Sequence, residues 1–80
     1  MMTPIDHSLD LRGVACPMNF VRTKLALDDL EAGQVLEVFL DDGEPINNVS
    51  RSLKDEGHEL LEIEPARPAG HRVVVKKARP

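Results

Sequence analysis

The sequence predicts an α+β fold: a two-layer sandwich of order βαβαββ, with two helices on one face of a four-stranded mixed sheet. Two observations lead to this prediction. Four stretches show the alternation or the short apolar runs typical of strands, and two stretches with helical spacing separate the first three of them. A chain of 80 residues can build one compact core, so residues 1–80 are expected to form a single domain.

The first strand is expected to begin at His7, where apolar Leu9 and Leu11 alternate with polar neighbours. Gly13 supplies the turn that follows this strand. A helix is then expected at about residues 17–30, because a proline stands at its start and apolar residues recur at helical spacing along it.

The apolar residues of this first helix form a broad arc, which suits contact with both the sheet and a second helix. The members of the arc are Met18, Phe20, Val21, Leu25, Leu27 and Leu30. Asn19 and Arg22 belong to the clearest polar stripe, which is expected to face solvent. Gly33 can adopt the left-handed conformation that commonly ends a helix, so it is expected as the C-terminal cap.

Residues 34–40 are almost continuously apolar, which predicts a strand in the centre of the sheet. The acidic turn 41–44 leads into a second helix, which has Pro45 in its first turn and ends at Gly57. One narrow apolar row at i, i+3 and i+7 is expected to lie on the sheet: Ile46, Val49 and Leu53.

The last two strands are expected at residues 59–64 and 72–76. The first of them alternates around Leu61 and Ile63, and the second contains three consecutive valines. The connection 65–70 contains two prolines and a glycine, which is typical of a hairpin-like turn between neighbouring strands.

Composition argues against several classes of function. The net charge is −4, the pI is about 5.2, and Phe20 and Phe39 are the only aromatic residues, so direct nucleic-acid binding is not expected. No apolar run is longer than three residues, which argues against a membrane span. The single cysteine, Cys16, cannot form an internal disulfide, so a reducing, cytoplasmic location is expected. Residues 1–6 and 78–80 are expected to be loose termini.

The dipeptide Cys16-Pro17 is the candidate site. Proline has no amide hydrogen and a φ preset near the helical value, so Pro17 is expected in the first turn of the helix and Cys16 at its N-cap. A thiolate there would face free amides and the positive end of the helix dipole, where a cysteine pKa can fall from about 8.5 to roughly 3.5–7.5. Arg12 is the nearest cation in the sequence and is expected to support the anion.

Other interpretations of the reactive-looking residues stay open. Many lone cysteines are small buried hydrophobes, and a single cysteine can also reduce peroxide through a sulfenic acid. The three histidines, His7, His58 and His71, show no metal-ligand spacing, and one of them would have to reach Cys16 to form a Cys–His dyad. No glycine-rich loop precedes a helix, so a phosphate-binding cofactor is not expected, and the histidine spacing with a single cysteine argues against a metal.

At these residues the chain resembles the TusA/SirA family of small sulfur-carrier proteins, and the resemblance covers nearly the whole chain, from His7 to Lys77. The elements that carry it are Leu9-Asp10 before Gly13, Cys16-Pro17, the turn at Gly33, Asp41-Asp42, Gly57-His58 and the closing valine strand. One departure concerns the usual Cys-Pro-x-Pro motif of the family, because Asn19 stands where its second proline is found.

The resemblance implies a two-layer βαβαββ sandwich and a cysteine that carries sulfur as a persulfide between two proteins. It would make Cys16 the sulfur carrier, Pro17 the residue that opens the helix, and Asp10 and Gly13 supports of the loop. The amide of Asn19 would then be solvated or bond toward the thiolate or persulfide.

Two functions are therefore weighed. The first is a sulfur-relay protein, rather than a stand-alone enzyme, that accepts sulfane sulfur from a cysteine desulfurase or a rhodanese-like donor and passes it to an acceptor protein. The alternative is a non-catalytic regulatory or protein-interaction module in which Cys16 is a structural helix cap. The chain ends Ala-Arg-Pro, so the thiocarboxylate chemistry of carriers that end in Gly-Gly is not expected.

Overall fold

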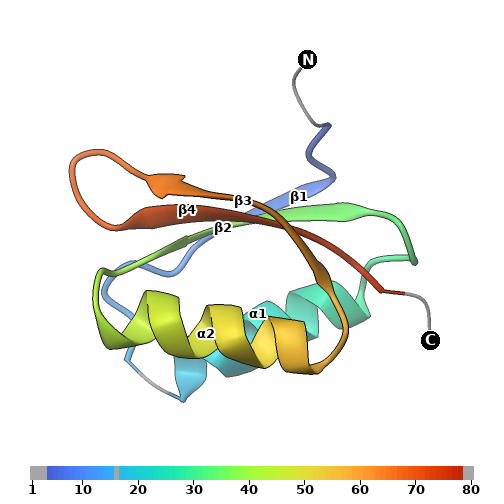
Figure 1. Cartoon of the computed structure of the whole chain (residues 1–80), viewed down its shortest axis with the longest axis horizontal. Helices are drawn as coiled ribbons and strands as arrows, with labels where there is room; N and C mark the ends of the chain where they lie inside the picture. The colour runs from blue at the N-terminus through green and yellow to red at the C-terminus, as the bar shows by residue number, and fades with distance from the viewer. Residues whose placement is uncertain (1–3, 16, 79–80) are drawn as a thin grey trace.

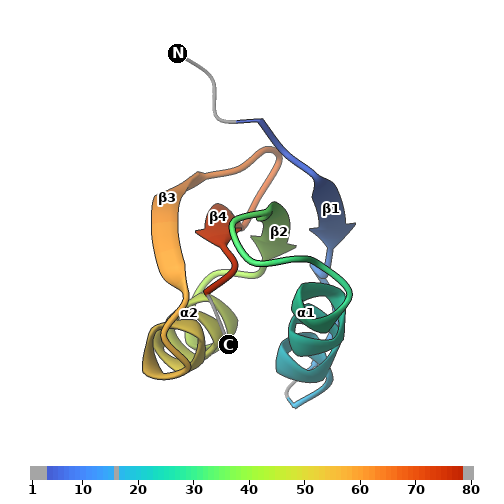
Figure 2. The same ribbon diagram turned by 90° about the vertical axis from the view of Figure 1, so that its right-hand side faces the viewer.

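The computed structural model describes residues 4–15 and 17–78 and confirms the predicted α+β fold. Its elements are β1 (His7–Asp10), α1 (Met18–Asp28), β2 (Val35–Leu40), α2 (Glu44–Asp55), β3 (Glu59–Pro65) and β4 (His71–Lys76). The four strands form one mixed sheet in the order β1-β2-β4-β3. Both helices lie on the same side of this sheet, as the end-on view shows (Figure 2).

The direction of the strands brings the starts of both helices to one end of the molecule. β1 and β2 are parallel neighbours, and α1 follows β1 just as α2 follows β2 (Figure 1). β4 runs antiparallel to β2 and to β3, between which it lies. Loops at the carboxyl ends of parallel strands are where open α/β sheets place their ligands, so this end is the first place to examine for function.

The core lies between the sheet and the two helices. Alternate residues of β2 and β4 point into it, and α2 contributes the narrow row that its spacing predicts. The buried members are Leu11, Leu27, Leu36, Val38, Leu40, Ile46, Val49, Leu53, Val73 and Val75. No helix among residues 4–15 and 17–78 is long and apolar enough to cross a membrane.

The predicted orientation of α1 is wrong. Met18, Val21 and Leu25 face outward with 51%, 37% and 59% of their surface exposed, whereas Asn19 and Thr23 are fully buried. The helix carries two apolar rows, and the row that contains Leu27 faces the sheet. The Thr23 side chain remains compatible with burial because its Oγ1 donates to the carbonyl oxygen of Asn19 at 2.8 Å.

The predicted alternation of β3 also needs a correction. The pairing of β3 with β4 shifts register between Leu60 and Glu62, which leaves Leu61 as an extra residue. As a result Leu60 and Ile63 pair with the buried Val75 and Val73. The inward-facing pair is therefore Leu60 with Ile63, not Leu61 with Ile63, because a one-residue bulge exchanges the two faces of a strand.

Two residues in the predicted loose termini are held by hydrogen bonds. The backbone amide of Asp6 donates to Val35 O at 2.9 Å, and its side-chain Oδ2 accepts from Val35 N at 2.8 Å. The backbone amide of Ala78 donates to Nδ1 of His58 at 2.9 Å. Residues 1–3, 79 and 80 lie outside the described residues.

Ser50 gives a stability prediction on α2. Its Oγ is buried and has no hydrogen-bond partner among the described residues. An unpaired buried hydroxyl costs about 1–3 kcal/mol, and alanine is also the better helix former. Ser50→Ala is therefore expected to raise the free energy of unfolding by about 1 kcal/mol in urea denaturation. Ser52→Ala is the matched control, since Ser52 lies on the same helix and gains helix propensity alone. Equal stabilisation of the two variants would contradict the prediction.

Candidate functional site

The connection from β1 to α1 is fixed to the end of β2. Leu11, which is buried, donates its backbone amide to Phe39 O at 2.8 Å, and Val14 N donates to Leu11 O at 3.1 Å. Between them Gly13 has φ of +84°, and its amide donates to Oδ2 of Asp41 at 2.8 Å. The Gly13 turn is confirmed, and its positive φ is a conformation that side chains with a Cβ rarely adopt.

Asp10 and Arg12 form a two-point ion pair at the start of this connection. Arg12 Nη2 lies 2.7 Å from Asp10 Oδ2, Arg12 Nε donates to Oδ1 at 2.9 Å, and the backbone amide of Arg12 also donates to Oδ1 at 3.1 Å. These hydrogen bonds from Arg12 lower the pKa of the Asp10 carboxyl from 3.8 to about 2 and raise the pKa of Arg12. The carboxylate thus stays ionised far into the acid range.

Arg12 also joins the loop to the connection between β3 and β4. Its Nη1 donates to the carbonyl oxygens of Arg67 at 2.9 Å and Ala69 at 3.2 Å. The guanidinium carbon stands 5.0 Å from the centre of the Phe39 ring, within the range of a cation–π contact. Arg12 therefore links three segments: its own loop, the connection between β3 and β4, and β2. The sequence did not predict these links.

The Asp10 pair gives a pH prediction. The pKa of Asp10 is lower in the folded than in the unfolded protein, so the pair stabilises the fold above pH about 4, and that stabilisation is lost as pH falls toward about 2. Asp10→Asn is expected to lower stability at neutral pH and to flatten its dependence on pH in this window, as measured by urea unfolding at a series of pH values. Glu31→Gln is the control, because Glu31 is exposed and has no ion pair among the described residues. An unchanged pH profile for Asp10→Asn would contradict it.

The first turn of α1 begins one residue later than predicted. Pro17 is the N-cap rather than a member of the first turn, and its carbonyl accepts from Val21 N at 3.0 Å. The carbonyl of Ala15 accepts from Asn19 N at 3.2 Å. Cys16, expected at the N-cap, lies outside the described residues, between these two acceptors in the chain. The first turn contains no acidic residue, so no carboxylate there offsets the positive end of the helix dipole.

Asn19 occupies the second position of α1 and is completely buried, so the expectation that its amide can be solvated is wrong. Its Oδ1 accepts from Phe20 N at 2.7 Å. Its Nδ2 has no hydrogen-bond partner among the described residues. A buried amide donor left unpaired is uncommon in folded proteins.

The structure brings most of the predicted supports together and adds one. Asp10, Arg12 and Gly13 act on the same loop, and Asp41 holds Gly13 from the end of β2. The sequence did not assign Asp41 a role in holding the Gly13 turn. The acidic pair directly after a strand was a usable signal, because the ends of parallel strands lie at the same edge of a sheet. Within residues 4–15 and 17–78, no group of three His, Cys, Asp or Glu side chains is placed to hold a metal ion.

The sequence model of the family described as Sulfurtransferase TusA matches residues 7–77. The chain belongs to the TusA family. Three members or neighbours illustrate the match, and each is a separate protein. One is a "Putative sulfur carrier protein" of Archaeoglobus fulgidus, which is 38% identical over 69 residues that cover 86% of this chain and 78% of the relative. Another is the "Putative sulfur carrier protein YrkI" of Bacillus subtilis. It is 49% identical over 57 residues, which cover 71% of this chain and 76% of the relative.

The fold of TusA proteins is also found in a solved structure. The SirA-like protein of Desulfitobacterium hafniense superposes with a TM-score of 0.79 at 26% sequence identity, over 91% of this chain and 99% of that one. The relatives' names support a role for this TusA chain in sulfur carriage, and such a role implies contact with proteins that donate and accept sulfur. The matched range includes every candidate site residue.

Proposed function

We propose that the chain carries sulfane sulfur as a persulfide on Cys16 and relays it from a donor protein to an acceptor protein. One observation carries the proposal. The single thiol of the chain stands between Ala15 and Pro17, whose carbonyls accept the first hydrogen bonds of α1, in a chain that matches the TusA family from residue 7 to 77. A thiolate that precedes this helix in the chain would be stabilised by the positive end of the helix dipole, which no first-turn carboxylate offsets.

The transfer needs no outside oxidant. The Cys16 thiolate attacks the terminal sulfur of a donor persulfide, the donor's sulfur–sulfur bond breaks, and the donor leaves as a thiolate. The same exchange with an acceptor thiolate then returns Cys16 to its thiolate form. Because the chain has no second cysteine, the persulfide cannot collapse into an internal disulfide.

The surrounding residues have positioning roles in this proposal. Asp10 and Arg12 tie the loop to the end of the sheet, and Gly13 lets the chain turn toward Asp41. Asn19 stands where the family usually has a proline, and its buried Nδ2, which has no partner among the described residues, is the donor that we assign to the sulfur in this proposal. The chain acts as a relay rather than as a stand-alone enzyme. Its donor is a cysteine desulfurase or a rhodanese-like protein in a reducing, cytoplasmic compartment.

One observation favours the alternative, a protein-interaction module with a structural cysteine. The guanidinium of Arg12 is already paired with Asp10, so it is not a free counter-ion for a thiolate. The pH dependence of alkylation separates the two functions. For a carrier, the rate of reaction with iodoacetamide is expected to reach half its maximum well below pH about 8.5. A rate that rises only near pH about 8.5, or complete protection of the thiol, would contradict the proposal.

A further inference from the structure

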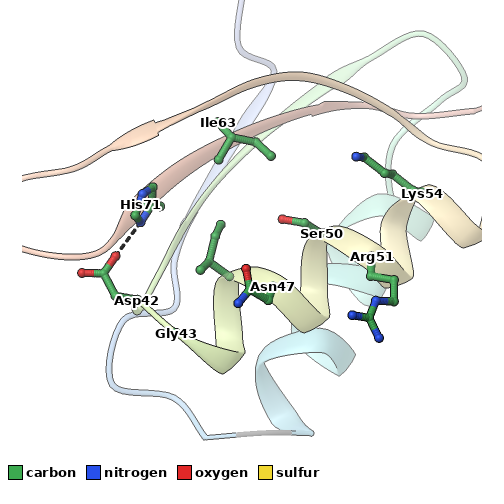
Figure 3. Close-up of a pocket in the computed structure, with 9 residues that line it drawn as sticks. Asp42, Gly43, Asn47, Ser50, Arg51, Lys54, Ile63 and His71 are labelled. Carbon is green, nitrogen blue, oxygen red and sulfur yellow. Dashed lines mark hydrogen bonds and ion pairs between the residues drawn. The ribbon is translucent and has the colours of Figure 1, made fainter.

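A hollow of about 690 Å³ lies between α2 and the edge strand β3, apart from the β1–α1 connection (Figure 3). Its size falls within the range of small-molecule sites, about 300–1,000 Å³. Ile46 of the helix and Ile63 of the strand both line it. Ile63 is 48% exposed, so α2 leaves this part of the strand uncovered.

The polar residues of the hollow are unevenly distributed along it. Arg51 and Lys54 lie at the end nearer the C-terminus of α2. Figure 3 shows the Lys54 side chain extending toward the strand above the helix, whereas the Arg51 side chain extends on the side of the helix away from that strand. Neither cation forms an ion pair within residues 4–15 and 17–78. At the other end the carboxylate of Asp42 lies 2.5 Å from His71 Nδ1. One end of the hollow is therefore cationic, on a protein whose net charge is −4.

The wall of the hollow also contains a polar group without a partner. Ser50 lies between the apolar and the cationic parts, and its buried Oγ has no hydrogen-bond partner within the described residues. Unsatisfied buried polar groups are rare in folded proteins and concentrate where function requires them. The apolar lining and the unpaired cations define the chemistry of an occupant, and the buried Ser50 hydroxyl lies in the wall between them.

We propose that this hollow binds a small amphiphilic organic anion. The carboxylate head lies at Lys54, with Arg51 supplying a second positive charge at the same end, and the apolar chain lies over Ile46 and Ile63. From Gly43 to Lys54 the helix rises about 16 Å, which is long enough for a chain of about eight carbons beside it. The proposal goes beyond sulfur carriage and does not depend on the chemistry of Cys16.

The test uses the full chain and octanoate as the probe. Octanoate is titrated into ¹⁵N-labelled protein, and saturable shifts are expected at the amides of Asn47, Ser50, Lys54 and Ile63. The double variant Arg51→Gln with Lys54→Gln is expected to weaken binding about tenfold, because charge-assisted hydrogen bonds to the head are lost. Octanol and acetate, which lack the charge and the chain respectively, are both expected to bind much more weakly than octanoate.

The matched control removes the same charges from the other helix. The control variant is Arg22→Gln with Lys24→Gln. Both residues are on α1, whose exposed apolar row is where an amphiphile would bind if binding were nonspecific. This control is expected to leave the affinity unchanged. The proposal is overturned by the absence of saturable shifts, by shifts centred on α1, by equal affinity for octanol or acetate, or by an unchanged affinity in the Arg51 and Lys54 double variant. Thermal melting confirms that each variant is folded.

Discussion

Gly70→Ala is expected to lower the free energy of unfolding by about 3 kcal/mol, a large share of the 5–15 kcal/mol typical of a domain. Gly70 has φ of +84°, where a residue with a Cβ loses about 1–2 kcal/mol. The added methyl would also stand 2.4 Å from the carbonyl oxygen of Leu40 and 3.1 Å from Cδ of Arg12. The backbone contact cannot be relieved by a side-chain rotation, so β2 and the start of β4 must move apart, at a cost of about 1–3 kcal/mol.

Gly57→Ala is the matched control for this prediction. Gly57 has φ of +89°, and an added Cβ would meet nothing within 4 Å. Its substitution therefore carries the conformational strain without the clash, about 1–2 kcal/mol. Urea unfolding of both variants measures the difference. Equal losses in stability would show that the close approach of Gly70 to Leu40 does not restrict this position.

Cys16→Ser is expected to reduce sulfur loading to background while leaving the fold intact. A serine oxygen cannot accept sulfane sulfur by thiolate exchange, and no other cysteine is present to replace it. The measurement is cyanide-labile sulfur on the protein after incubation with a cysteine desulfurase and free cysteine. ¹H–¹⁵N spectra of the variant check the fold.

A second variant distinguishes a built site from any available thiol. Asn48→Cys, introduced into the Cys16→Ser protein, places a thiol on the exposed surface of α2. If the donor recognises the loop before α1, sulfur loading of this thiol is expected to remain at background. Full recovery of loading at position 48 would show that exposure of a thiol is sufficient, and it would contradict the special role of Cys16.

The parts of the fold that the sequence predicted well have one unambiguous apolar face. On α2 a single row made of Ile46, Val49 and Leu53 is apolar, and this row is buried. The almost continuously apolar β2 lies inside the sheet, as predicted, for the same reason. Where a segment has only one apolar face, burial of that face determines how the segment is oriented in the fold.

The errors arose where the pattern offered two choices. On α1 both the Met18 row and the Leu27 row are apolar, and contact with the sheet selected the second, although it buries Asn19. In β3 a single extra residue at Leu61 reversed the expected alternation. Both outcomes depend on contacts between segments distant in the chain, which local periodicity does not encode.

The candidate site was predicted in part for a similar reason. Gly13 and Pro17 could be placed next to the helix start because their backbone preferences act locally. The links from Arg12 to Ala69 and from Gly13 to Asp41 join residues far apart in sequence. Asp10 stands only two residues before Arg12, but the local sequence does not show that Arg12 also binds the carbonyls of the turn before β4.

The central claim is that Cys16 holds sulfane sulfur. The most direct measurement is the mass of the tryptic peptide that contains Cys16, after loading from a cysteine desulfurase or a rhodanese-like donor and trapping with iodoacetamide. We predict that this peptide is heavier by one sulfur atom than the simple alkylated thiol, and that a reducing thiol added after trapping removes this sulfur together with its alkyl group and leaves the free Cys16 thiol. A Cys16 peptide that stays at the mass of the simple alkylated thiol with both donors would contradict the account.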